Sequence, residues 1–474
     1  MRQDGSTEAV IEVSDTTQQA FGGVAQNPVS VLAQSAIQTA IASLGYNPDK
    51  EIDRLVNTVE FSYSSDVTQL GDPFTVSVPD PRGRYVAKFR KGQTIRLYLQ
   101  NPNVDGSART LKAIGLIVNR RVRTNREGTV IQLDCADLGW HLTHTDAPLW
   151  YRLSNLPNIN EAVTLYDLLT NPDWIDPSWG FRGISADNET NRLLKQRLNA
   201  GRVQREIDLR QALGVLTWIQ VEPGVKIADY LTQYSRRQGR LVNVSADGYI
   251  QVWTPDYARE PLFSIDLRDL NDPARNRNNV IEADIQDSIE GVYTDVTCVG
   301  EQIGLDITQQ NLADQNYTKF RGRFQNKFVI PFSRRATFSE GDIYDEDTGK
   351  KQALWFYQRG LFDSWSATYK VRGHWQKPHG STRAYWWESD QMCAVNDSVH
   401  GLAGNFYVSA VRCDRNAQDG DVTFVTLRLP CLRASFGPFP DAPIQRSVPV
   451  DGYAAKNTTE TASEITVTEP QTSQ

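Results

Sequence analysis

Hydrophobic and polar residues alternate along much of this 474-residue chain, and this alternation restricts the possible folds more than any other feature. Side chains on a β-strand point alternately to opposite faces of the sheet, so a period of two indicates strands with one buried face. Residues 51–150 contain a series of such segments: VNTVEFSYSS, PFTVSVPD, TIRLYLQN, AIGLIVNRRVRT and TVIQLDCAD. We predict a first domain here, a small antiparallel β barrel or sandwich with short turns.

A second β domain is predicted over residues 278–438, where the alternation resumes. Its predicted strands flank an internal helix, TGKKQALWFYQRGLFDSWSATYK, and include NVIEADIQDS, GVYTDVTCVGEQ, FYVSAVRCDR and DVTFVTLRLP. Each β domain has a strand near its start, VNTVEFSYSS or GVYTDVTCVGEQ, and a closing hairpin with a charged turn, RTNREG or DRNAQDGD. These shared features indicate a diverged internal repeat.

Residues 151–277 combine both periods and are predicted to form an α+β insert domain. The segments AVTLYDLL, TNRLLKQRL and VKIADYLTQYSRR have helical spacing. Asp247-Gly248 separates two short alternating segments, VNVS and YIQVW, and is typical of a tight hairpin turn with positive φ. We expect a helix to cover one face of this small sheet.

The two ends of the chain are expected to lack a packed core. Residues 1–50 are predicted to be a flexible arm with a short helix over 28–44, which Asn27 caps and Pro28 starts. That helix packs either on its own domain or on a neighbouring subunit. Residues 439–474 are rich in Ser, Thr and Glu and are predicted to be disordered.

The charge and cysteine content exclude several classes of protein. The net charge is −7, with 50 basic and 57 acidic residues, whereas a chain built to grip phosphate backbones normally has a basic excess. No apolar run approaches the ~20 residues of a membrane span, and the N-terminus has no signal-peptide core. Five widely spaced cysteines favour reduced, buried thiols over a disulfide framework: Cys135, Cys298, Cys393, Cys413 and Cys431. We expect folding in the cytoplasm.

Two histidine pairs are candidate metal ligands. His141 and His144 have i, i+3 spacing, which on a helix places both rings on one face, and Asp146 follows closely. His374 and His379 flank a probable loop. We expect ordinary polar or capping roles instead, because neither pair has a further strong ligand within sequence reach.

The segment GDIYDEDTGK, residues 341–350, partly resembles a calcium-binding loop. Asp345 and Asp347 alternate before Gly349, but Thr348 occupies a ligand position and the bidentate Glu is missing. The preferred interpretation is a helix that begins near Lys350, capped by Asp347 or Thr348.

The aromatic pair Trp386-Trp387, next to Glu388 and Asp390, is the nearest approach to a sugar-binding platform with acids. Packing at a barrel end or a subunit seam is the preferred interpretation. A separate cluster, RRVRTNREG, places Arg120, Arg121, Arg123 and Arg126 in one hairpin. It suits pairing with acidic neighbours better than nucleic-acid binding, because four charges attract phosphate only weakly.

The order of these segments carries a family resemblance. The first β domain has a strand, GLIVNRRV, and its hairpin partner, VIQLDCADLGWHL; the α+β segment that follows has a helix, GVKIADYLTQYSRRQG, and a strand pair, VNVSADGYIQVW. The return into the second β domain is NVIEADIQDSIEGVYTDVTCVGE. The chain then has the helix KKQALWFYQRGLFDSWSATYKVRGHW and a closing strand pair, FYVSAVRCDR and VTFVTLRLP. This order resembles the baseplate hub proteins of contractile phage tails, particularly the Mu-like hub family and the related tail protein D group. The resemblance covers about residues 50 to 436 and departs from the family in the N-terminal lead, an insert at 171–224 and the acidic tail.

The resemblance implies both a fold and a role. Hub subunits carry two antiparallel β-barrel domains with the tail-tube fold, so the implied fold is mainly β with an α+β insert. Three subunits form a pseudo-sixfold ring that joins the tail tube to the central spike and leaves a channel for DNA. The implied partners are other copies of the chain, the tube protein or tube initiator, the spike protein, and baseplate wedge and tape measure proteins.

We therefore expect a non-enzymatic virion protein of the tail baseplate, assembled in the host cytoplasm. We expect no catalytic, cofactor-binding or metal residues, no sequence-specific nucleic-acid binding and no stable membrane insertion. The alternatives are a cell-wall or polysaccharide hydrolase with Glu388 or Asp390 as the acid, a glycan-binding protein that uses Trp386 or Trp387, and a spike-loading component of a contractile injection system.

Overall fold

The fold is given by a computed structural model of the chain. It describes residues 7–13, 56–80, 85–86, 88–105, 109–126, 128–148, 165–187, 223–237, 240–269, 271–273, 275–300, 321–326, 329–340, 346–378, 381 and 383–431. The predicted helix at 28–44 and the predicted tail at 439–474 lie outside these residues.

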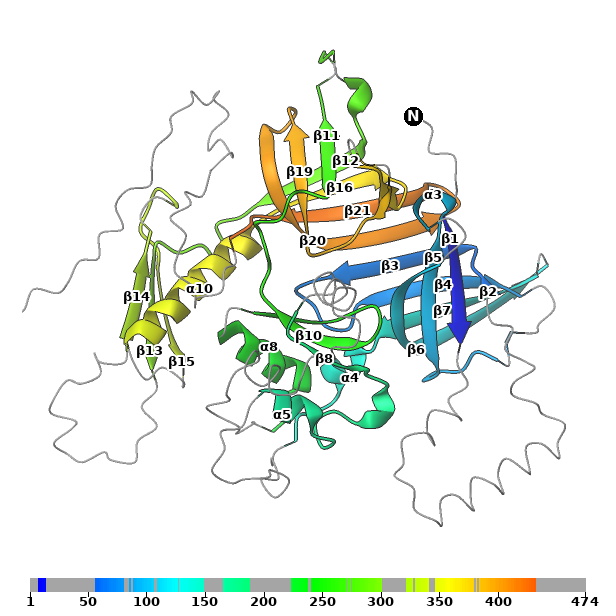
Figure 1. The fold of residues 1–474 in the computed structure, drawn as a ribbon, viewed down its shortest axis with the longest axis horizontal. Helices are drawn as coiled ribbons and strands as arrows, with labels where there is room; N and C mark the ends of the chain where they lie inside the picture. Colours follow the sequence, from blue (N-terminus) through cyan, green and yellow to red (C-terminus); the bar gives the residue numbers. More distant parts are fainter. Residues whose placement is uncertain are drawn as a thin grey trace, which may run out of the picture.

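One large sheet dominates the molecule (Figure 1). Its strands are β1 Glu8–Val13, β2 Val56–Asn57, β3 Glu60–Asp66, β4 Pro73–Pro79, β5 Thr94–Gln100, β6 Thr110–Asn125, β7 Gly128–Asp137, β11 Phe263–Leu267, β12 Val280–Asp287, β16 Trp365–Arg372, β19 Gln391–Asp397, β20 Leu402–Asn416 and β21 Gly420–Arg428. Neighbouring strands follow the order β12-β16-β21-β20-β3-β4-β7-β6-β5-β1-β2, and β19 joins β20 to β11. The mainly β class is confirmed, but pairing among the described strands follows an open path and closes no barrel.

Two groups of five strands in this sheet have the same order. The first β unit is β3-β4-β7-β6-β5, and the second β unit is β12-β16-β21-β20-β19. Each unit gains one further strand at its end, because β1 pairs with β5 and β11 pairs with β19. The internal repeat predicted from the closing hairpins is therefore present in the topology. The strand that corresponds to β3 is β12, however, and not the later segment GVYTDVTCVGEQ.

The repeat extends to the residue level in the closing hairpins β6–β7 and β20–β21. The long first strand has a bulge in each hairpin, at Val118 between Ile117 and Asn119, and at Ser409 between Val408 and Ala410. Both long strands then continue over the same length to an Asn that pairs with a Gly, Asn125 with Gly128 and Asn416 with Gly420. A bulge bends a strand and re-aims its side chains, so a shared bulge position gives both units the same curvature.

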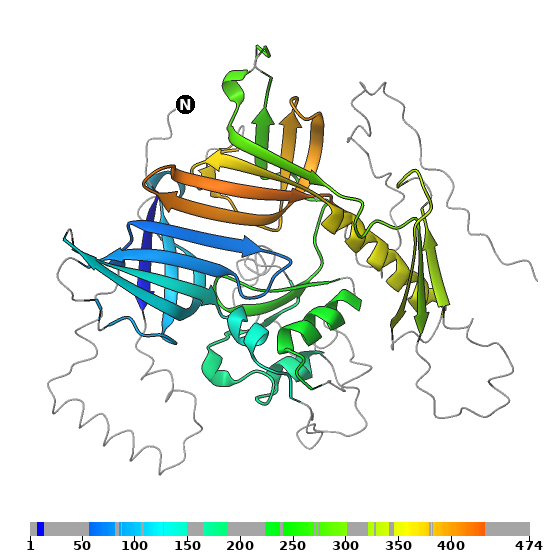
Figure 2. The same cartoon turned by 180° about the vertical axis from the view of Figure 1, so that it is seen from behind.

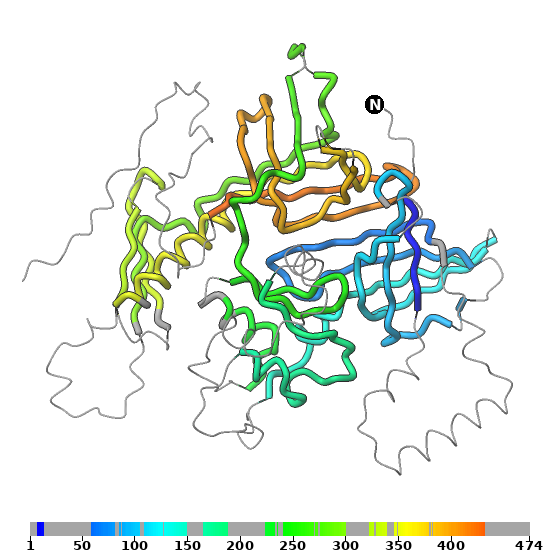
Figure 3. Tube along the Cα trace, in the orientation of Figure 1, coloured from blue at the N-terminus to red at the C-terminus, as the bar shows by residue number. Residues whose placement is uncertain are grey.

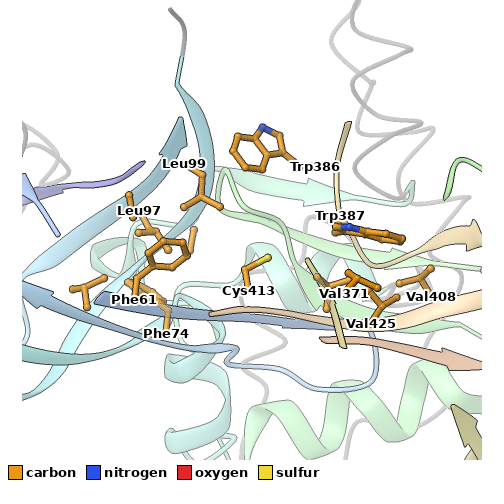
Figure 4. Close-up of a cluster of buried hydrophobic side chains, with 14 of the residues drawn as sticks. Phe61, Phe74, Leu97, Leu99, Val371, Trp386, Trp387, Val408, Cys413 and Val425 are labelled. Atoms are coloured by element: carbon orange, nitrogen blue, oxygen red, sulfur yellow. The ribbon is translucent and has the colours of Figure 1, made fainter. Parts of the chain in front are cut away.

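The two β units are joined edge to edge by a seam between β20 and β3. The seam is antiparallel and pairs Ala410 with Asp66 through to Arg415 with Phe61. One hydrophobic core crosses it, and Figure 4 shows Phe61 and Phe74 of the first unit in one cluster with Cys413, Val408 and Val425 of the second. The two units are thus one packed body within the chain.

A small α+β region lies below the seam in Figures 1 and 2. A three-stranded sheet in the order β8-β10-β9 packs with short helices around a separate core. These elements are α4 Gly139–His144, α5 Leu165–Thr170, η2 Pro177–Trp179, β8 Gly183–Ser185, α8 Ile227–Arg237, β9 Leu241–Val244 and β10 Tyr249–Trp253. The predicted hairpin is confirmed, since β9 and β10 pair antiparallel and Gly248 has φ +88°, but the expected two-residue turn is not formed. Asp247 lacks the positive φ that this turn needs, and the Ser245 N–H donates to the Tyr249 carbonyl across a three-residue loop.

The region from 278 to 364 differs from the prediction. The segment GVYTDVTCVGEQ contains β13 Asp295–Gly300, which leaves the large sheet and pairs with β14 Arg321–Gln325 and β15 Arg335–Glu340. The helix α10 Glu346–Ser364 packs on this side sheet (Figure 1). The helix lies so close to β14 that only glycine fits at position 322: a Cβ on Gly322 would lie 1.8 Å from the backbone carbonyl carbon of Gly349 in α10. Helix and strands form a small unit inserted between β12 and β16.

Two further expectations need correction. Residues Glu8–Val13, within the predicted flexible arm, form β1, which pairs with β5 and buries Ile11 completely. Ala9 and Ile11 belong to the core, and Figure 3 shows the backbone trace of β1 running beside the strands of the first unit. β11, placed by prediction in the α+β insert, instead pairs parallel to β19 and extends the second β unit.

Candidate functional site

The histidines considered as metal ligands have structural partners. α4 is helical as required, but the His144 ring stacks on Trp140 at 4.2 Å between centroids and the His141 ring stacks on Trp179 at 5.1 Å. Asp146 is paired with Lys226 at 2.5 Å. Burial lowers the pKa of His141, so its ring stays neutral, as stacking on indole allows.

Of the second histidine pair, only His374 has a described position. His374 is buried, lies 2.9 Å from Thr423 Oγ1 through Nδ1, and packs on Phe61 near the seam. Burial lowers the pKa of His374 to about 3, which keeps it uncharged. His379 lies outside the described residues. Over the part of the chain that the structure describes, no group of three or more His, Cys, Asp or Glu side chains could hold a metal ion.

The calcium-like segment is the start of a helix. α10 begins at Glu346, slightly earlier than the predicted Lys350, so Asp347 and Thr348 lie inside the first turn. Asp347 pairs with Lys351 at 2.5 Å, four residues along the helix. Acidic residues in the first turn favour a helix because they complement its dipole. Asp345 lies outside the described residues.

The tryptophan pair is buried and offers no exposed sugar platform. Trp386 and Trp387 are 5% and 3% exposed, and Trp387 stacks on Phe263 with centroids 4.3 Å apart. Glu388 pairs with the nearly buried Lys112 at 2.7 Å, which ties the second β unit to the first. The Asp390 carboxylate accepts a hydrogen bond from Tyr407 Oη at 2.7 Å. The two tryptophans therefore serve packing in this fold, and both acids have partners within the chain.

All five cysteines are free and buried, as expected. Burial raises the pKa of the Cys135, Cys393 and Cys413 thiols, which makes them poor nucleophiles. No described helix is long and apolar enough to span a membrane. The thiols of Cys135, Cys393 and Cys413 belong to the single core that the two β units share.

Two buried carboxyl groups at the end of β7 were missed by sequence reasoning. The Asp137 N–H donates to the Asp72 carbonyl at 3.0 Å, and the Asp137 carboxylate accepts a hydrogen bond from Gly139 N–H at 2.8 Å. Burial raises the pKa of Asp137 to about 7, and burial together with the Asp137 charge raises the pKa of Asp72 well above its usual range. They hold the junction between the first β unit and α4.

The strongest surface feature is a pair of open strand edges. In β6, residues 112–117 are buried, whereas every residue from Val118 to Asn125 is exposed. This second half contains Arg120, Arg121 and Arg123, and the β6–β7 hairpin projects beyond the rest of the sheet (Figures 1 and 2). The predicted exposed basic hairpin is confirmed. Within the described residues, no acidic side chain forms an ion pair with these three arginines.

The second open edge belongs to β12, which ends the described path of the large sheet. β12 pairs with β16 on one side, and no described strand pairs with its other side. Its sequence, VIEADIQD, exposes Glu282, Asp284 and Asp287. The sequence showed the strand and its acids, but only the strand order shows that this edge is open.

Solved structures of tail proteins share this fold. A tail protein from Neisseria meningitidis MC58 has a TM-score of 0.59 at 16% identity, over 90% of this chain and 98% of that protein. The 43 kDa tail protein of prophage MuSo2 from Shewanella oneidensis has a TM-score of 0.57 at 13% identity, over 91% and 99%. No protein family and no curated protein matches the sequence. The resemblance to phage tail proteins is confirmed at the level of the fold.

Proposed function

We propose that this chain is the structural hub of a contractile-tail baseplate and forms a homotrimeric ring between the tail tube and the central spike. The observation that carries the proposal is the internal repeat: two β units with one strand order are joined edge to edge in a single chain. A trimer of such chains presents six similar units around one axis. It can therefore meet a sixfold tube on one side and a threefold spike on the other.

The open edges support assembly into a closed ring. An exposed strand edge is a template for pairing with another chain, and proteins cover or charge such edges to prevent uncontrolled association. Each chain has an open basic edge and an open acidic edge on different strands. Contacts between unlike edges repeat head to tail, and such contacts close into a ring when the rotation between copies permits.

In this role the chain has structural partners and no substrate. The tube protein or tube initiator would stack on one face of the ring and the spike on the other, with wedge and tape measure proteins outside or within. The net charge of −7 suits a DNA channel, because a basic lining would hold the phosphate backbone. The protein would act in the virion, after assembly in the host cytoplasm.

The proposal is tested on the purified full chain by native mass spectrometry and electron microscopy, alone and with its tube and spike proteins. We expect a trimer with a central channel and approximate sixfold features. A chain that stays monomeric at micromolar concentration with both partners present would contradict the proposal.

A further inference from the structure

The strand β20 shows how one edge of a β unit can serve two neighbours. Its first half, Leu402–Val408, pairs with β19 of the same unit. Its second half, from Ala410 to Arg415, pairs along that edge with β3 of the other unit. The bulge at Ser409 separates the two halves. The inter-unit seam thus uses the part of the strand that lies beyond β19.

The strand β6 has the same construction but lacks the second neighbour. Its first half pairs with β5, from Leu116 with Thr94 to Thr110 with Leu99. The half beyond the bulge at Val118 pairs only with β7 among the described strands, and the loop that contains Val86 and Phe89 touches it through Arg120. By its place in the repeat, this half of β6 corresponds to the half of β20 that forms the seam.

The strand β12 corresponds to β3 and also lacks its outer neighbour. Both strands pair antiparallel with the next strand of their unit, β12 with β16 and β3 with β4. The outer edge of β3 is occupied by β20, whereas no described strand occupies the outer edge of β12. Each chain therefore has two strand edges that correspond to the two sides of the seam but have no described strand paired with them: β6 corresponds to β20, and β12 corresponds to β3.

Transferring the register of the seam to the unused edges aligns opposite charges. Because the two hairpins share a bulge position, Asn119 of β6 is the counterpart of Ala410 in β20, and Arg123 is the counterpart of Asp414. The β3–β4 and β12–β16 registers make Ile285 of β12 the counterpart of Tyr63 in β3. The resulting opposed pairs are Arg120 with Asp287, Arg121 with Gln286, Val122 with Ile285, Arg123 with Asp284, Thr124 with Ala283 and Asn125 with Glu282. Three basic residues thus meet a strand whose charged residues are all acidic.

The two faces of this pairing also suit burial. In the seam, Phe61, Val411 and Cys413 face the core. The corresponding positions at the unused edges place Val122 against Ile285 on that side, and Ile285 already packs at the margin of the core. Val122 is 38% exposed, so a strand paired with this edge would bury apolar surface. Arg121 and Arg123 lie on the outer face, where Arg123 is opposite Asp284 and Arg121 is diagonal to it, and oppositely charged cross-strand pairs are favourable there.

We propose that the half of β6 from Asn119 to Asn125 pairs antiparallel with the outer edge of β12 in a second copy of the chain, in the register of the β20–β3 seam. The inference rests on the proposed ring and names the contact that closes it. The contact is head to tail, so each copy gives its basic edge to one neighbour and its acidic edge to the other.

Charge reversal on the outer face tests the pairing without touching the core. The first variant is Arg121→Asp with Arg123→Asp, the second is Glu282→Arg with Asp284→Arg, and the third combines all four changes. Arg120 is left intact because it donates to the Val86 and Phe89 carbonyls within its own chain. Lys377→Asp, at an exposed loop residue, is the matched control. Circular dichroism confirms that each variant is folded.

Sedimentation velocity at low salt then reports self-association. We expect each double variant to associate at least tenfold more weakly than the wild type, the fourfold variant to regain association, and the control to match the wild type. If the double variants form the same ring as the wild type, this pairing is wrong while the hub proposal stands. If the wild-type chain forms no ring even with tube and spike proteins, the hub proposal itself fails, and the pairing with it.

Discussion

The seam between β20 and β3 and the open edges of β6 and β12 are counterparts in the repeat, but they differ in chemistry. On the seam, β3 presents Ser62, Ser64 and Ser65, and Ser62 donates a hydrogen bond to Asp414 at 2.7 Å. The open edges present arginines on one strand and acids on the other. The strands of the seam belong to one chain, so their local concentration is high and small polar side chains suffice. Edges that meet between chains benefit from charge, which prevents like edges from pairing and steers unlike ones together.

Removing the seam core should have the largest effect on the chain itself. Phe61 is 3% exposed on β3 and packs on His374. Phe61→Ala leaves a cavity and should lower the free energy of unfolding by about 3–5 kcal/mol. Denaturation in guanidinium chloride checks this, with Phe332→Ala as the control, because Phe332 is 50% exposed. Equal loss in both variants would show that the seam is not a packed core.

The first β unit should lose stability as the pH rises, whereas the buried His374 of the second unit acts in the opposite direction because burial lowers its pKa. The first unit buries two carboxyl groups, those of Asp72 and Asp137. The aligned strand registers of the second unit have Trp365 and Leu429 at the corresponding positions, which carry no ionisable group. The folded pKa of Asp137 is raised to about 7, so its contribution to stability is complete below about pH 4 and is lost as the pH rises through 7. The expected loss between pH 4 and pH 7 is on the order of 4 kcal/mol.

Thermal unfolding between pH 5 and pH 8 measures this loss. His374 contributes equally to both proteins, so the comparison isolates Asp137. From pH 5 to pH 8 the Tm of Asp137→Asn should rise relative to that of the wild type, because the variant lacks this titrating carboxyl group. An unchanged slope in the variant would assign the pH dependence to other residues.

A close backbone approach distinguishes the two units further. Gly115 on β6 occupies the place of Phe406 on β20, and a Cβ at Gly115 would lie 1.9 Å from the Ala136 carbonyl oxygen. Gly115→Ala should force the hairpin backbone apart and cost about 1–3 kcal/mol. Urea denaturation compares it with Gly92→Ala, where no atom lies within 4 Å but φ is +82°. A Gly115→Ala variant at least as stable as the wild type would contradict this packing.

The smallest effect on the single chain is expected at the open edge. Val122→Ala should change the free energy of unfolding of the isolated chain by no more than about 0.5 kcal/mol, since no described strand covers this residue. It should still weaken self-association, which sedimentation measures on the same sample. A large loss of stability in the isolated chain would mean that Val122 is already covered.

The sequence predicted those parts of the fold that depend on local signals. Asp247-Gly248 indicated its hairpin because few residues adopt positive φ, and the alternation in the β6–β7 and β20–β21 segments gave both closing hairpins. The placement of β13 was missed, because period two identifies a strand but not its partners. The same limit applies to the candidate site. The arginines of β6 were recognised, whereas the acids of β12 gained meaning only when strand order showed an open edge.

Disulfide cross-linking between copies tests the central claim most directly. Val122→Cys with Ile285→Cys introduces thiols at positions opposed in the proposed register, where Cβ atoms of facing residues lie about 4.5–5.5 Å apart. The five native cysteines are buried, so they should remain reduced. The control pairs Val122→Cys with Ile281→Cys, which is out of register. Mild oxidation should give covalent species up to a closed trimer in the first variant and few in the control. Rings that form without this cross-link, or cross-linking that is equal in the control, would contradict the account.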